Sequence, residues 1–234
     1  DESDLVTAEL VKTAENAYRD VQIAFANEVA LICEAAGGDV WRVRELVNKT
    51  PYRNMHLPGA GVGGHCIPKD PWLLAYSAHA SETPLRLIPA ARAVNESMPH
   101  HIADLLSRAL QQSGLPTSNA RVLVLGFAYL EESDDTRNSP SAALVSELSR
   151  RGITSAIHDP YVSPYQGDIL SRAAGCQAAV LMVRHREYAN LDLGALANSL
   201  THPLLIDGRN LYTPEQAQAA GIQLWSLGRS HLGE

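Results

Sequence analysis

The first part of the chain has the apolar periodicity of a long helix. Residues 5–36 are predicted to form one helix, because Ser3 or Asp4 can cap its start and the glycine pair 37–38 can end it. From Val21 onward the helix is apolar on almost every face. Such a helix is expected to be buried on all sides, either in a domain core or against a second subunit.

Shorter helical patterns follow, separated by glycine and proline. One is opened by Asp39 and ends before Pro51, and a stretch rich in Gly and Pro then covers about residues 50–70. A short helix is predicted to begin at Pro71, because proline at the first position of a helix loses no hydrogen bond.

A second long helical pattern covers residues 83–113 and contains two prolines. Pro89 and Pro99 are each expected to kink the helix or to restart it, and Gly114 with Pro116 ends it. We expect this segment to be the arm that joins one domain to the next.

The second half of the chain alternates short apolar runs with short helical patterns. This alternation is typical of βαβ units and a parallel sheet. The sequence therefore predicts an α/β protein, with an all-helical central dimerisation domain over residues 1–115 and a Rossmann-like, doubly wound parallel-sheet domain over residues 116–234. The expected strands are RVLVLGF, ITSAIHD, AAVLMV, PLLIDG and IQLWSL.

The glycine fingerprint of a dinucleotide-binding sheet is absent. The first predicted strand is followed by Gly126 alone, without the second and third glycines of Gly-x-Gly-x-x-Gly. The run GAGVGG at Gly59 matches this fingerprint only in its letters, because no predicted strand precedes it and the residue before it is Pro58. Asp159 follows the second strand; it could hold a ribose hydroxyl or simply start a turn with Pro160.

Composition narrows the class of protein. The formal net charge of −7 argues against the basic face that a nucleic-acid partner needs. No apolar run approaches the roughly 18 residues of a membrane span, and the N-terminal residues do not resemble a signal peptide. We therefore expect a cytoplasmic protein that binds neither nucleic acid nor membrane.

The cysteines do not form a disulfide or metal pattern. Cys33 and Cys176 stand in apolar surroundings, where they are expected to fill a core. The chain has no Cys-x-x-Cys pair, and the adjacent His65 and Cys66 do not have the usual spacing of zinc ligands. No metal site is expected.

Cys66 differs from the other two because it lies in the stretch GAGVGGHCIPKDPWLL, residues 59–74. Lys69 and the positive end of the helix predicted at Pro71 favour an ionised, nucleophilic thiol. The glycines are interpreted as giving a ligand access to the backbone. Asp70 could act as a base or could be the N-cap of the following helix.

Lys12 and Asn16 lie four residues apart, on one face of the first helix. A lysine charge and a fixed amide donor suit a developing oxyanion, although two solvated polar residues have the same spacing.

These motifs together resemble the UDP-glucose/GDP-mannose dehydrogenase family, over nearly the whole chain. GVGGHCIPKDPWLL resembles the family's catalytic cysteine motif, and LVKTAENAYRDVQIAFANEVA resembles its central helix. RVLVLGFAYLEESDDTRNSPS and HDPYV are similar to its C-terminal domain. The residues around the cysteine, with His65 before it, are similar to the branch that oxidises UDP-N-acetylhexosamines, especially UDP-N-acetylmannosamine.

The resemblance implies a mechanism and a cofactor. The family oxidises the C6 alcohol of a nucleotide sugar to a carboxylate with two NAD+, through a thiohemiacetal and a thioester on a cysteine, here Cys66. Lys12 and Asn16 are implied to stabilise the oxyanion, and Asp70 to assist as a base or to hold a water. Arg53 and His56 are implied to reach the sugar nucleotide across a homodimer interface. The remaining substrate-binding residues implied by the match are Gly63, Gly64, His65, Lys69, Arg137 and Arg209.

Two departures from the family pattern change the expectation. In the family, an NAD-binding domain precedes the central helix and holds most of the cofactor; here nothing precedes it, so we expect a fragment that is inactive alone. Leu130 stands where the family often has a substrate-binding lysine. A nucleotide-sugar-binding module without catalysis, and oxidation of UDP-glucose or UDP-N-acetylglucosamine, are the alternatives. A cysteine hydrolase using Cys66 with His56, His65 or His79 is a third.

Overall fold

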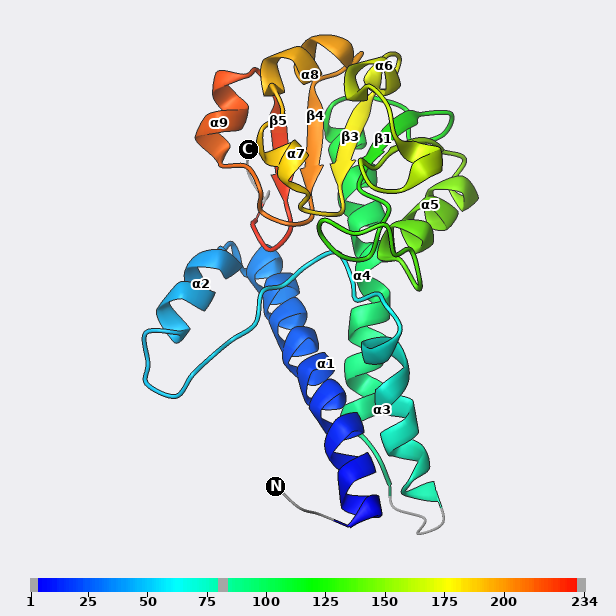
Figure 1. Cartoon of the computed structure of the whole chain (residues 1–234). Helices are drawn as coiled ribbons and strands as arrows, with labels where there is room; N and C mark the ends of the chain where they lie inside the picture. The colour runs from blue at the N-terminus through cyan, green and yellow to red at the C-terminus, as the bar shows by residue number, and fades with distance from the viewer. Residues whose placement is uncertain (1–3, 80–83, 231–234) are drawn as a thin grey trace.

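The computed structural model describes residues 4–79 and 84–230. Figure 1 shows a layered α/β domain at one end, and three helices, α1, α3 and α4, that run together away from it. Among the residues described, no helix is both long and apolar enough to cross a membrane.

Helix α1 covers Leu5–Ala36, as predicted. Asp4 caps it by accepting a hydrogen bond from the backbone N–H of Thr7 at 2.9 Å, and Gly37 ends it in the left-handed conformation with φ of 83°. Within this chain the helix is not buried on all sides, because Phe25 remains 58% exposed. Helix α2, Val40–Val47, starts at the Asp39 cap, also as predicted.

Helix α3 covers Cys66–Tyr76 and so begins five residues earlier than predicted. Proline did not mark its start, because Pro68 and Pro71 are both tolerated inside the helix. Pro68 lies in the first turn, where N–H groups have no acceptor within the helix. Pro71 removes one hydrogen bond, to the carbonyl of Ile67.

Helix α4 covers Leu87–Gln112 without interruption, so the expected restart at either proline is wrong. Pro89 lies in the first turn, and the helix continues through Pro99 to its end before Gly114. The predicted start at residue 83 lies outside the described residues. The proposed domain division, between residues 115 and 116, falls in the turn after α4 and stays a prediction.

The α/β domain contains the five predicted strands in one parallel sheet of order β2-β1-β3-β4-β5. Two short segments were not predicted, the 3-10 helix Ser163–Tyr165 and helix α7, Arg186–Ala189. The strands are β1 Arg121–Leu125, β2 Thr154–His158, β3 Ala178–Leu181, β4 Leu204–Asp207 and β5 Gln223–Ser226, and the other helices are α5 Pro140–Arg150, α6 Ile169–Ala173, α8 Leu193–Ser199 and α9 Pro214–Ala219.

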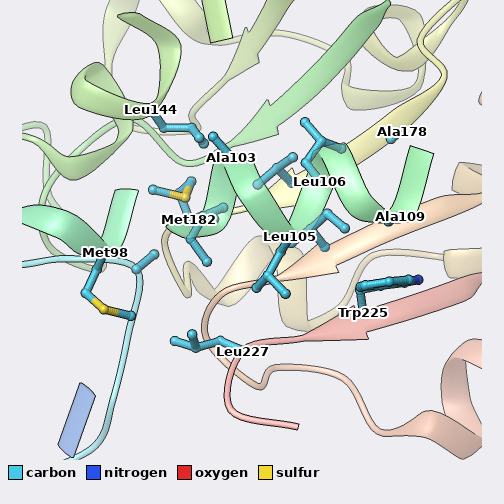
Figure 2. Packing of buried hydrophobic residues seen from close by; sticks show 14 of the residues in the cluster. Met98, Ala103, Leu105, Leu106, Ala109, Leu144, Ala178, Met182, Trp225 and Leu227 are labelled. Carbon is cyan, nitrogen blue, oxygen red and sulfur yellow. The ribbon is translucent and has the colours of Figure 1, made fainter. Parts of the chain in front are cut away.

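The strands alternate their side chains between two cores, one on each face of the sheet. On one face the second half of α4 packs against the sheet, where Leu105 lies near Trp225 and Leu227 (Figure 2). The same cluster continues to small residues of α1 such as Ala30. This shared core fixes the helical part against the sheet, and therefore fixes the loop that carries Cys66.

Candidate functional site

Cys66 is the first residue of α3, and its side chain is exposed. The N-terminus of a helix directs backbone N–H groups and partial positive charge toward a residue in this position. Helix α3 packs against α1, so Lys12, Lys69 and Asp70 line one pocket of about 690 Å³ together with Cys66. The structure thus brings residues 54 positions apart in sequence to one place.

Asp70 lies beneath this pocket, only 5% exposed. Its Oδ2 accepts a hydrogen bond from Asn16 Nδ2 at 2.6 Å, and its Oδ1 lies 3.3 Å from Lys69 Nζ. Asp70 stands inside α3 and not at its start, so its interpretation as an N-cap is wrong. Lys12 lies at the pocket but pairs with Glu15 at 3.1 Å. Asn16 and Asp70 therefore form a hydrogen-bonded pair. Lys12 and Asp70 line the pocket, whereas Asn16 is not among its lining residues.

The glycines before Cys66 are packed against the α/β domain, a role that the sequence did not indicate, and Gly59, Gly61 and Gly63 also line a pocket. A Cβ on Gly61 would lie 3.0 Å from Pro140 Cβ, and one on Gly63 would lie 2.5 Å from Tyr129 Cβ. Gly64 has φ of 86° and lies under the ring of Tyr129. Only glycine fits this close approach.

Hydrogen bonds from the α/β domain also hold the loop. Gly64 N–H donates to the carbonyl of Arg137 at 2.8 Å, and Asn138 Nδ2 donates to the carbonyl of Gly64 at 2.9 Å. The Arg137 side chain donates to Asp135 from Nε at 3.0 Å, and this bond lowers the pKa of Asp135 to about 2. Cys66 is thus placed by residues of the other domain.

A second pocket, of about 320 Å³, is lined by residues of the same loop, among them Gly59, Gly61 and Gly63. Three of its side chains are arginines and a fourth is a histidine, which carries a positive charge when protonated. None of the described residues that line it is acidic. Tyr129, Leu130 and Ile23 add an apolar wall. This combination suits an anion attached to a flat or apolar group. The four basic side chains are those of Arg19, Arg44, His56 and Arg209.

Arg209 is set in this pocket by the turn after β4. The buried Asp207 carboxylate accepts hydrogen bonds from the backbone N–H groups of Arg209 at 2.9 Å and Tyr212 at 2.9 Å. Arg209 Nε donates to the carbonyl of Met182 at 2.6 Å. Burial lowers the pKa of Arg209, so an anionic ligand would relieve an electrostatic cost. A Cβ on Gly59 would lie 2.5 Å from Arg209 Nη1, so this glycine makes room for the guanidinium.

His56 faces two cations in the same pocket. Burial, and then the charges of Arg19 and Arg44, lower its pKa. Arg19 and Arg44 were not predicted from the sequence. The signal for Arg19 was present, because it follows Lys12 and Asn16 at helical spacing on α1. No local signal pointed to Arg44, which reaches the pocket from α2.

Asp159 does not hold a ribose. It is fully buried, and its Oδ2 accepts hydrogen bonds from the N–H groups of Phe127 at 2.6 Å and Ala128 at 2.8 Å. Burial opposes its ionisation, but hydrogen bonds from His185 and these amides hold the pKa of Asp159 well below its usual value. The amides after β1 would have to bind a pyrophosphate in a dinucleotide site. The described sheet therefore does not fit NAD.

The remaining predicted substrate residues are dispersed. Arg53 and His65 are exposed, and neither lines either pocket described above. Lys69 lines the pocket that contains Cys66, whereas His56, Gly63 and Arg209 line the second pocket. Gly64 uses both of its backbone polar groups within the protein. The substrate and catalytic roles of all these residues stay predictions.

The two halves of the chain match two domain models of one family. Residues 6–97 match the central domain, and residues 123–214 match the UDP binding domain, of the UDP-glucose/GDP-mannose dehydrogenase family. The chain belongs to this family.

Its relatives include dehydrogenases of N-acetylated nucleotide sugars. It is 41% identical over 206 residues to the UDP-N-acetyl-D-mannosamine dehydrogenase of Pyrococcus horikoshii, covering 88% of this chain and 48% of that protein. It is 34% identical to the NDP-N-acetyl-D-galactosaminuronic acid dehydrogenase of Ralstonia nicotianae, over 93% of this chain and 51% of the relative.

Solved structures show the same architecture. The structure of the UDP-D-ManNAc dehydrogenase of Pyrococcus horikoshii superposes with a TM-score of 0.89 and 38% identity, over 97% of this chain and 53% of the other. An NDP-N-acetyl-D-galactosaminuronic acid dehydrogenase from Methanosarcina mazei also gives a TM-score of 0.89, at 33% identity, over 96% of this chain and 51% of the other. The chain spans about half the length of the curated relatives it matches.

Proposed function

We propose that this chain supplies the catalytic cysteine and the nucleotide-sugar pocket of an NAD-dependent UDP-sugar 6-dehydrogenase. The substrate is a UDP-N-acetylhexosamine. We favour UDP-N-acetylmannosamine, because the similar Pyrococcus horikoshii protein is a UDP-N-acetyl-D-mannosamine dehydrogenase. The observation that supports this best is a pair of pockets, one lined by the glycines before Cys66 and by basic side chains, the other lined by Cys66 itself. One pocket presents cations to a diphosphate, and the other presents Cys66 to the sugar.

In this proposal Cys66 Sγ forms a C–S bond to the C6 aldehyde, and the carbonyl oxygen takes a proton. The aldehyde itself arises when the C6 alcohol loses a hydride from carbon and the proton of its hydroxyl. The same loss, of the remaining C6 hydride and the hydroxyl proton, converts the thiohemiacetal to a thioester. Water then adds to the thioester carbon, the C–S bond breaks, and the carboxylate leaves with the thiolate restored. Asn16 is fixed by Asp70 and supplies a donor to the oxyanion, while Asp70 takes up a proton from water.

When bound, NAD+ would supply the hydride acceptor for the two oxidations. Since the described sheet does not fit NAD, we assign most of its binding to a separate N-terminal domain. The chain alone is then expected to bind nucleotide and to show no turnover. Fusion to an NAD-binding domain, or use of a longer parent protein, followed by NADH formation with UDP-N-acetylmannosamine, tests this assignment. Turnover by the chain alone would contradict it.

Binding of UDP to the second pocket, which we call the cationic pocket, can be tested on the chain itself. Arg209→Met is expected to weaken UDP binding about 10- to 100-fold, because a charged donor to phosphate is lost. Isothermal titration calorimetry measures the change in Kd. Arg186→Met is the matched control, since this arginine lies in the same domain and is exposed. Equal Kd values for the two variants would contradict a phosphate site at Arg209.

We also propose a homodimer through α1. Val11, Tyr18, Phe25 and Ile32 repeat at seven-residue spacing and are 63%, 65%, 58% and 59% exposed. A stripe of this kind is usually covered by a partner helix. Phe25→Glu is expected to convert a dimer to a monomer in sedimentation velocity. Tyr76→Glu, at an exposed aromatic residue outside the stripe, is expected to remain dimeric. A wild-type monomer at micromolar concentration would refute the dimer.

Leu130 supports a second candidate function, a nucleotide-sugar-binding module without catalysis. It is 51% exposed and gives the second pocket an apolar side chain in place of a cation. Tight binding of UDP-sugars by a parent protein that forms no NADH with UDP-N-acetylmannosamine, UDP-glucose or UDP-N-acetylglucosamine would favour it.

A further inference from the structure

A series of buried polar side chains connects α1 to α4 and ends at Gly59, in the loop before Cys66. Its members are Asp20 and Asn27 on α1, and Arg92 and Asn95 on α4. None of the four is more than 2% exposed. They lie where these helices otherwise pack with small apolar residues such as Ala24. We call these four residues the polar relay.

The polar relay is connected by direct hydrogen bonds. Arg92 Nη1 donates to Asp20 Oδ1 at 2.7 Å, and Asn95 Nδ2 donates to the same oxygen at 2.7 Å. Asn27 Nδ2 donates to Asn95 Oδ1 at 2.9 Å. The last bond leaves the helices, because the backbone N–H of Gly59 donates to Asn27 Oδ1 at 2.8 Å.

The direction of these bonds is set at the Asp20 end. Asp20 Oδ1 can only accept there, so Asn95 must present its NH₂ group to Asp20 and its oxygen to Asn27. Asn27 must in turn present its NH₂ group to Asn95, which leaves its oxygen facing Gly59. A proton on the other Asp20 oxygen would not change this order. The relay therefore places an acceptor, and never a donor, at the N–H of Gly59.

Gly59 is the residue against which Arg209 lies, and it lines the cationic pocket. We propose that Asn27 and Asn95, oriented by Asp20, are positioning residues for this pocket: they fix Gly59, and Gly59 fixes Arg209. This inference rests on the proposed function for its ligand, a UDP-sugar. It assigns a role in binding to residues that touch no substrate.

Stability alone does not require such a relay. Replacing buried polar partners with apolar groups of similar shape is often neutral or stabilising, since the cost of removing them from water is then avoided. A buried acceptor that must face one particular N–H instead selects one position of the loop. A residue that lines a binding pocket needs such a fixed position.

The test compares three variants of the 234-residue chain, with UDP as the probe. Asn27→Leu removes the acceptor at Gly59 and is expected to weaken UDP binding about tenfold. Asn95→Leu leaves Asn27 free to turn and is expected to weaken it about threefold. Because both act through one hydrogen bond, the double variant should bind no worse than Asn27→Leu.

Leu110→Ala is the matched control, since it removes a fully buried side chain from α4 outside the relay. It is expected to lower Tm without changing Kd measured well below Tm. Hydrogen exchange of the Gly59 amide should lose protection in Asn27→Leu and keep it in Leu110→Ala. Additive losses of UDP affinity, or an unchanged Kd in Asn27→Leu with a lower Tm, would overturn the proposal.

If the wild-type chain binds no UDP, the proposed nucleotide-sugar pocket is contradicted. Exchange at Gly59 then decides the relay alone: lost protection in Asn27→Leu supports it, and retained protection overturns it.

Discussion

Cys66→Ser is expected to lower the formation of uronic acid by at least about 10³-fold in a protein that contains this chain and an NAD-binding domain. Serine keeps the size of the side chain but is not ionised near neutral pH. It therefore cannot add to the aldehyde, or leave from an ester, as a thiolate does. The measurement is NADH formed per enzyme with UDP-N-acetylmannosamine, together with the acid released. Binding of UDP should remain within about twofold, because Cys66 lines the other pocket and not the cationic one.

The control for this substitution is another thiol of the same chain. Cys33 is 6% exposed near the end of α1, far along the helix from Lys12 and Asn16. Cys33→Ser is expected to lower stability and to leave turnover of the folded enzyme unchanged. Full turnover to the acid by Cys66→Ser would exclude the thioester mechanism. An equal loss in both variants would point to unfolding instead of chemistry.

The elements that could be predicted from sequence are those whose boundaries depend on neighbours in the chain. Asp4 and Gly37 bound α1 because a cap needs only the next few residues. The five strands follow from short apolar runs between turns. The start of α3 was missed, because Pro71 was treated as a start signal although α3 continues through it with the loss of one hydrogen bond.

The parts of the site that could not be predicted depend on contacts between distant segments. Asn27 and Asn95 are 68 residues apart, and nothing local in either helix distinguishes them from exposed amides. Tyr129 closes over Gly64 from the loop after β1, so the glycines had a packing reason that their own stretch did not reveal. The resemblance to a family indicated the chemistry at Cys66, whereas only the fold brings Arg19 and Arg44 to Arg209.

Gly63→Ala is expected to disable the site although it adds one methyl group and touches no charge. The added Cβ would lie 2.5 Å from Tyr129 Cβ, 2.8 Å from the Asn138 carbonyl oxygen and 2.9 Å from Pro140 Cδ. None of these atoms is the end of a flexible side chain, so the loop itself must shift. We expect stability to fall by about 1–3 kcal/mol. A shift of about 1 Å at Cys66 is expected to lower turnover about 100-fold.

The matched control is Gly38→Ala, because a Cβ there would have its nearest neighbours at 3.6 Å, an ordinary contact. Urea unfolding gives the free energy of each variant, and UDP titration with NADH assays gives binding and turnover. Gly63→Ala should weaken UDP binding as well, since Gly63 also lines the cationic pocket. Wild-type binding and turnover in this variant would show that the loop can move away from Tyr129 without consequence. The close fit between loop and α/β domain would then not be what places Cys66.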